Sequence, residues 1–193
     1  VVRYNVNEHF KIQVTGGADI NFMNFQDYAA PTSPGFEQGQ LQISDFRNRM
    51  YNVEALAIYN NSYKKFDYGV TIGGNLYKVD NKTQIVTAKE MVMRDVIALQ
   101  SFTSKEITEG TYRKQINSLY GSINLAYGNF VYLDATLRGD HSSTLPSGNN
   151  TYLYPSVSGS FLFSEFFKIN PTLLPYGKVR VSWAQVGSDT DPY

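Results

Sequence analysis

Apolar and polar side chains alternate at a period of two through most of the second half of this chain. Between residues 119 and 127 the odd positions are Leu119, Gly121, Ile123, Leu125 and Tyr127, whereas the even positions carry a more hydrophilic set. Because successive side chains of a β-strand point to opposite faces, this rhythm predicts strands with one apolar face and one wet face. A helix would need a period near 3.6.

The alternation recurs along the chain, less regularly in its first half. We expect seven strands, at 10–21, 50–60, 66–79, 115–127, 131–138, 153–163 and 178–183. Long and short connections alternate: about 28 residues at 22–49 and about 35 at 80–114, against about six and two residues for the connections that follow each of them. The last connection is expected to hold a short helical turn at 165–168.

Three architectures produce strands of this kind, and they differ in where the apolar face points. A soluble sandwich or a soluble barrel packs it inward, whereas a transmembrane barrel turns it toward lipid and has short periplasmic turns and long outer loops. The unequal connections favour the transmembrane barrel. So do aromatic residues at strand ends beside the short connections, where an interfacial girdle is expected: Tyr127, Phe130, Phe161, Phe163 and Tyr176. Seven strands cannot close a bacterial barrel, whose strand number is even, so residues 1–193 are expected to form part of one.

Composition excludes several other classes of protein. The 17 basic and 17 acidic side chains cancel, which argues against nucleic acid as a partner. Cysteine is absent, so disulfides and thiolate chemistry are excluded. The longest apolar run, 55–59, is far shorter than the roughly 20 residues of a membrane-spanning helix. The chain begins without methionine and stops in a turn-like sequence, so we expect a piece of a longer polypeptide.

Four ordered motifs resemble a known family. They are the segments 120–127 (YGSINLAY), 132–143 (YLDATLRGDHSS), 154–158 (YPSVS) and 177–187 (GKVRVSWAQVG). Together they look like the mid-barrel block of SusC/RagA-type TonB-linked (TonB-dependent) outer-membrane transporters of the Bacteroidetes. The stretch from 1 to 114 matches this family less sharply.

The resemblance implies both an architecture and a function. The architecture is a barrel of about 22 strands with a plugged lumen, in the outer membrane of a Gram-negative, Bacteroidetes-like cell. The function is the import of oligosaccharides or peptides, driven by the TonB complex and assisted by a SusD-like surface lipoprotein. The plug domain and the segment that contacts TonB are not expected within residues 1–193. The alternative hypothesis is a soluble carbohydrate-binding or adhesion β-domain.

Charged side chains on the wet face are the first candidate site. Asp134, Arg138, Lys178 and Arg180 are expected to form a mixed-charge wall that faces the lumen, with Arg138 and Asp140 paired at its outer rim. Two interpretations stand for this wall. It solvates the lumen and pairs with the plug, which we favour, or it guides a polar substrate.

The long connections supply the second candidate site. Tyr28, Phe36 and Phe46 recur among polar residues of 22–49, where they could stack on sugar rings or pack within the loop. In 80–114, the sequence Thr87-Ala88-Lys89-Glu90 resembles a helix capping box before Met91, so this segment is expected to hold a short helix or a hairpin. An apolar patch around Met91 could contact a lid protein, although packing against other loops is favoured.

Catalysis and metal binding find little support in the sequence. Asp140, His141 and Ser142 are consecutive, and neighbours on an extended chain point in different directions, so they cannot form a proton relay. His9 and His141 lie in unrelated segments, which disfavours a metal site. Oxygen-bearing side chains recur at 188–191 as in a calcium loop, but an ordinary polar loop is favoured there. We expect no enzyme activity, no metal and no cofactor.

Overall fold

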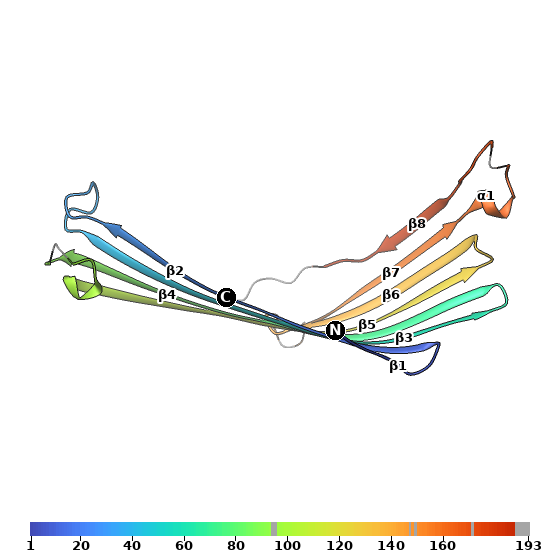
Figure 1. Cartoon of the computed structure of the whole chain (residues 1–193), viewed down its shortest axis with the longest axis horizontal. Coiled ribbons are helices and arrows are strands. Elements are labelled where there is room, and N and C mark those ends of the chain that lie inside the picture. The colour runs from blue at the N-terminus through green and yellow to red at the C-terminus, as the bar shows by residue number, and fades with distance from the viewer. Residues whose placement is uncertain (94–95, 147, 149, 171, 188–193) are drawn as a thin grey trace. The chain divides into compact units, whose positions relative to one another are not determined.

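The structure is a computed structural model that describes residues 1–93, 96–146, 148, 150–170 and 172–187. It divides into two compact units. The first unit contains Val1–Gly17, Asn52–Tyr77 and Gln115–Tyr193, and the second contains Ala18–Tyr51 and Lys78–Lys114. Strands of both units belong to one antiparallel sheet in which each strand pairs with its neighbours in chain order, from β1 to β8 (Figure 1).

Eight strands form this sheet. They are β1 (Val2–Asn5), β2 (Phe10–Ala29), β3 (Gln40–Tyr63), β4 (Phe66–Met91), β5 (Phe102–Tyr127), β6 (Val131–Ser142), β7 (Thr151–Phe161) and β8 (Val179–Ala184). The seven expected strands are all present. The additional strand, β1, has four residues that pair with Lys11–Val14 of β2, too short a segment for the alternation to stand out. Among the described residues, the fold is therefore all-β apart from two single helical turns.

The two long connections expected from the sequence are mostly strand. Segment 22–49 is divided between β2 and β3, which leaves 30–39 as the connection, and segment 80–114 is divided between β4 and β5, which leaves 92–101. The reason is visible in β5, where residues 103–111 are all exposed. A strand wetted on both faces shows no alternation of polarity, so the period-two pattern misses it.

Both helical expectations needed correction. The turn placed at 165–168 is α1 (Phe163–Phe166), two residues earlier. The capping box at Thr87–Glu90 is wrong, because these residues lie in β4 and Glu90 has a left-handed backbone with φ of 64°; the alternative, a hairpin, agrees with the pairing of β4 and β5. The nearest helical turn is the 3-10 turn η1 (Leu99–Ser101). No helix in the described part of the chain is long and apolar enough to cross a membrane.

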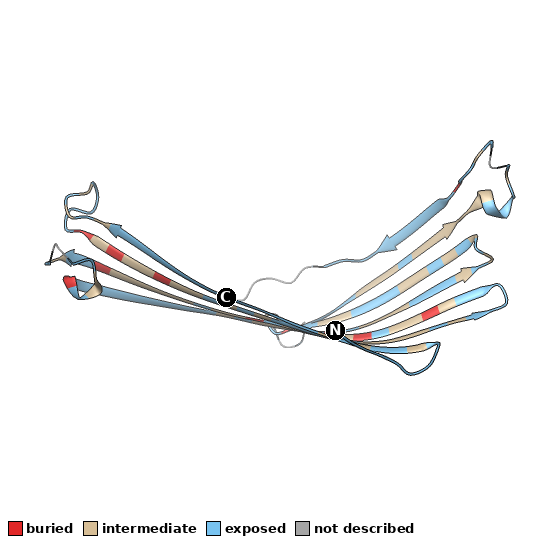
Figure 2. Ribbon diagram, viewed as in Figure 1, coloured by how far each residue is buried: buried red, intermediate tan, exposed pale blue. Residues whose placement is uncertain are grey.

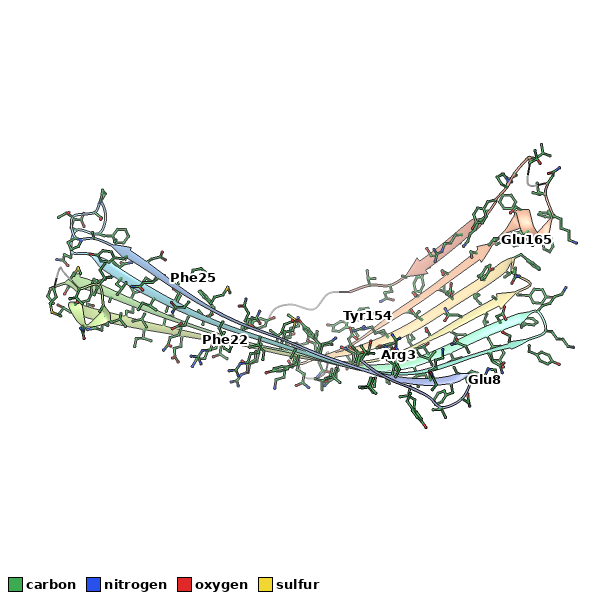
Figure 3. All side chains as sticks on the ribbon, viewed as in Figure 1. Arg3, Glu8, Phe22, Phe25, Tyr154 and Glu165 are labelled. Atoms are coloured by element: carbon green, nitrogen blue, oxygen red, sulfur yellow. The ribbon has the colours of Figure 1, made fainter. Side chains whose placement is uncertain are left out.

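Few side chains are buried. The described hydrophobic residues that are buried are Leu41, Val79, Ala88 and Phe102, and three of them, Leu41, Ala88 and Phe102, form one cluster within the second unit (Figure 2). Side chains project from both faces of the strands (Figure 3), and the first unit leaves Leu119 69% and Val181 72% exposed. A soluble sandwich would cover such residues with a second sheet. Here the strands form a single layer, so its apolar face needs an apolar phase outside the chain.

Candidate functional site

Strand register gathers the apolar residues of the first unit on one side of the sheet. Leu125 pairs with Leu133, Leu133 with Gly159, and Gly159 with Val181, so the odd positions of β5, β6, β7 and β8 share a face. We call this the apolar face. Its members on these strands are Leu119, Gly121, Ile123, Leu125, Tyr127, Val131, Leu133, Ala135, Leu137, Gly139, Leu153, Pro155, Val157, Gly159, Phe161, Val179, Val181 and Trp183. None of these side chains carries a charge.

An aromatic row ends the apolar face beside the short connections. Tyr127 packs against Phe66 and Phe130, with ring centroids 4.6 and 5.6 Å apart. Phe130 and Phe161 both contact Phe166 of α1, at 5.1 and 5.4 Å. Such rows occupy the membrane–water interface in transmembrane barrels. Two further residues expected here lie nearby in the chain: the Phe163 ring covers Gly177, and Tyr176 is exposed.

A polar row ends the apolar face on the other side. Asn117 pairs in register with His141, and His141 with Thr151. The His141 Nδ1 atom lies 3.2 Å from the Thr151 hydroxyl. The side-chain amide of Gln115 donates to the side-chain oxygen Oδ1 of Asn117 at 3.1 Å. Along β5, ten residues separate Asn117 from Tyr127, which corresponds to about 26 Å of membrane depth at a strand tilt of about 40°. The apolar band of an outer-membrane barrel is about 25 Å tall, so the face has the height that a bilayer requires.

The opposite, polar face carries the predicted wall. Asp134 accepts hydrogen bonds from the Asn124 amide at 2.6 Å and from the Ser158 hydroxyl at 3.3 Å. The hydroxyls of Thr136 and Ser156 lie 2.6 Å apart one pair further along. Each interaction joins neighbouring strands, so the wall is cross-linked by polar contacts rather than by apolar packing.

Arg138 is the centre of a second group on this face. Its guanidinium donates to the Asp140 carboxylate at 2.7 Å and to the Ser118 hydroxyl at 2.9 Å. It also lies 5.6 Å from the centre of the Tyr120 ring, and the Tyr120 hydroxyl donates to the Glu54 carboxylate. The group therefore connects β6, β5 and β3.

Two more predicted residues of the wall come from the last strand. Arg180 pairs in register with Ser160, on the polar face, and Lys178, just before β8, places its ammonium 5.9 Å from the Tyr132 ring. All five charged residues singled out in the sequence thus lie on or beside the polar face. That this face lines a lumen stays a prediction.

The candidate residues of the outer connections lie in the second unit. The Tyr28 hydroxyl is 3.4 Å from the Met91 sulfur, and Met91 packs against the Leu41, Ala88 and Phe102 cluster. Phe46 forms an edge-to-face pair with Phe25, which lies on β2 (Figure 3), at 6.0 Å. Phe36, in the turn between β2 and β3, is 41% exposed. Tyr28, Phe46 and Met91 thus pack locally, and a role in substrate or lid contact stays a prediction.

The residues weighed for catalysis and metal binding do not converge. Asp140 binds Arg138 on the polar face, whereas His141 points to the apolar face and contacts Thr151. No group of three or more His, Cys, Asp or Glu residues in the described part of the chain could hold a metal ion. The proposed calcium loop, 188–191, lies outside the described residues.

Sequence reasoning missed several polar residues. Glu54 and Ser118 complete the Arg138 group, but their partners lie 66 and 20 positions away in sequence, so only strand register reveals them. The polar row of Asn117, His141 and Thr151 had a sequence signal. Each of these residues lies two positions beyond the last member of the apolar face on its strand. A change from apolar to polar at that position marks the end of the apolar face.

Comparison with known proteins gives the fold a context. No family model matches the chain. The chain is 22% identical over its whole length to 20% of a TonB-dependent receptor, P26, of Formosa agariphila. Its fold matches a solved structure of the RagAB peptide transporter, with a TM-score of 0.84 over 94% of this chain and 21% of the other at 16% identity. The RagAB peptide importer in its open-open state gives a TM-score of 0.80 at 17% identity, with the same shares covered.

This chain spans about a fifth of the length of the relatives that it matches. The eight antiparallel strands, the apolar face and the structural match agree with the sequence resemblance. The chain therefore has the fold of a segment of a transmembrane β-barrel, and it is similar to TonB-dependent receptors of the SusC/RagA type.

Proposed function

We propose that this chain is the central part of the barrel of a TonB-dependent transporter in the outer membrane of a Gram-negative bacterium. The observation that carries the proposal is the apolar face, bounded by an aromatic row and a polar row about 26 Å apart in depth. A face of that height fits a lipid bilayer. The similarity to a TonB-dependent receptor over the whole chain supports active import.

In this proposal the polar face belongs to the lumen. Asp134 accepts two hydrogen bonds from neutral groups, and Arg138 donates two, one of them to the Asp140 carboxylate, so both side chains have polar partners before any substrate arrives. Such residues keep the lumen wet and offer fixed partners to a plug domain. We favour this role over direct guidance of the substrate.

The proposed cargo is an oligosaccharide or a peptide, taken up with a SusD-like surface lipoprotein and energised by the TonB complex through parts of the protein outside residues 1–193. The RagAB structures are named for a peptide transporter. That name supports peptides, but a likeness at 16% identity concerns the fold, so both cargo classes stand. The proposed contacts with substrate or lipoprotein all lie in the second unit: Tyr28, Phe36, Phe46 and Met91.

Growth of a deletion strain tests the transport proposal. Removal of the gene that encodes the complete polypeptide is expected to abolish growth on one oligosaccharide or peptide mixture as sole nutrient and to leave growth on its monomers unchanged. The gene should restore growth, whereas the same gene without its TonB-contact segment should not. Unchanged growth on every oligosaccharide and peptide source, or a polypeptide without a plug and a TonB-contact segment, would contradict the proposal.

A further inference from the structure

The apolar face contains a hollow. It has a volume of about 870 Å³ and lies entirely within the first unit, over β4 to β7. Large apolar side chains form its rim, and each of them is at least 48% exposed: Ile72, Leu119, Ile123, Leu137 and Leu153. The volume falls within the range of small-molecule sites.

Small residues create this hollow. Gly121, Ala135 and Gly139 lie among the large side chains on the same face and border it. A Cβ atom added to Gly121 would meet nothing nearer than the Thr71 carbonyl oxygen at 3.6 Å, so the space above this glycine is open. Along β5 the hollow extends from Asn117 to Ile123, about 20 Å at the rise of a β-strand.

One end of the hollow is polar and the other is not. Asn117, His141 and Thr151, the polar row, border it together at the end remote from the aromatic row. Thr151 engages the Nδ1 atom of His141, and the described residues supply no hydrogen-bond partner to its Nε2 atom. The row crosses three adjacent strands and is therefore about 10 Å wide. A long apolar hollow with hydrogen-bonding groups at one end is complementary to an amphiphile.

We infer that the hollow holds one acyl chain of an outer-leaflet lipid with a sugar headgroup, and that the polar row binds this headgroup. The hollow is continuous with the face that meets lipid in a transmembrane barrel. Short turns of such barrels are periplasmic, which places the aromatic row toward the inner leaflet and the polar row toward the outer one. Three hydrogen-bonding groups spread over about 10 Å, with no Lys or Arg among the residues that line the hollow, match the hydroxyl groups of a sugar better than a charged phosphodiester, which Arg or Lys would recognise.

The inference rests on the part of the proposed function that places this chain in an outer-membrane barrel with its short turns on the periplasmic side. It goes beyond transport and does not depend on the cargo, so a failed growth test would leave it standing. The inferred lipid differs from the mobile lipids around any barrel, because it should stay bound to the protein during extraction in detergent.

Retention of lipid by the purified, complete polypeptide tests it. The protein is extracted from the outer membrane in mild detergent and washed, and bound lipids are counted by mass spectrometry. We expect about one glycolipid per protein chain. Gly121→Leu fills the hollow and His141→Ala removes a headgroup donor, and each should lower retention by about fivefold or more, the effect of losing roughly one hydrogen bond or the equivalent apolar contact.

Two matched variants control for general effects. Gly159→Leu adds the same side chain to the apolar face outside the hollow, where the nearest atom to a new Cβ is the Tyr132 carbonyl oxygen at 4.0 Å. His9→Ala removes a histidine whose ring contacts the Asn60 carbonyl oxygen instead. Both should retain lipid as the wild type does. Ala135→Leu replaces Gly121→Leu if the latter fails to fold, as judged by heat-modifiable gel mobility. Equal retention in all variants, or retention of phospholipid in place of glycolipid, would overturn the inference.

Discussion

Arg138 shows how a single side chain can join strands that the sequence separates widely. It contacts Asp140 on its own strand and Ser118 on β5, and it lies against Tyr120, which donates to Glu54 on β3. A lysine could not reproduce this arrangement, because its ammonium lacks the planar fork with which arginine addresses several acceptors at once. The polar face is thus organised around one cation and its acceptors.

Loss of this cation should destabilise the barrel modestly. Arg138→Ala leaves the half-buried Asp140 without its partner, and we expect a loss of about 1 kcal/mol, since the guanidinium is 45% exposed and water screens the pair. Heat-modifiable gel mobility of the complete polypeptide would show conversion at a lower temperature. Arg180→Ala is the matched control, because the described residues offer Arg180 no hydrogen bond or ion pair. An equal effect of both variants would show that the Arg138 group contributes nothing of its own.

At the scale of the strand, two adjacent glycines on β4 behave differently. A Cβ atom on Gly73 would lie 2.6 Å from both the Leu56 side chain and the Tyr120 ring, whereas one on Gly74 would lie 3.6 Å from the Ser118 carbonyl oxygen. Gly73 therefore gives Tyr120 the room to lie across β4 and reach Glu54. Gly74 points to the other face and has no such neighbour.

Gly73→Val should accordingly disturb the polar face more than Gly74→Val. The added methyl groups displace Tyr120 from Glu54, and overpacking of this kind costs about 1–3 kcal/mol. The measurement is again the temperature of heat-modifiable conversion, combined with near-ultraviolet circular dichroism of the tyrosines. Gly74→Val changes the same backbone by the same side chain, so it should shift conversion far less. Similar shifts would attribute the loss to the strand backbone instead of the Tyr120 contact.

The strands that the sequence predicts well are those with one lipid face and one wet face. From Gln115 to Trp183 the alternation of polarity assigned the faces that the register then showed. It failed at 103–111, where both faces are exposed and carry mostly polar residues, and at β1, which has only four residues. The sequence could not assign the partners of Arg138. Those contacts depend on how β3, β4 and β5 pair, and the polar ends of these strands show no alternation from which the strand lengths could be predicted.

At the scale of the whole molecule, the longest strands are much longer than a bilayer requires. β4 and β5 have 26 residues each, about 85 Å of extended chain, whereas an apolar band of about 25 Å needs only 9–11 residues of tilted strand. The excess cannot lie within a bilayer, and in β5 its residues 103–111 are all exposed and mostly polar. In the proposed transporter, such polar strand continuations would meet a surface partner or substrate outside the bilayer.

The two faces of the lipid segment should differ in chemical access. Asp134→Cys and Leu133→Cys place one thiol on each face of β6 at adjacent positions; residues 1–193 contain no cysteine, and labelling of the unsubstituted complete polypeptide gives the background to subtract. In intact outer membranes, we expect a small, charged, membrane-impermeant maleimide to modify Asp134→Cys faster than Leu133→Cys, because the first thiol meets water in the lumen and the second meets hydrocarbon. After denaturation in detergent, both thiols should react at the same rate, which controls for expression. Faster labelling of Leu133→Cys in the membrane would mean that the apolar face is turned inward and that the barrel orientation proposed for this chain is wrong.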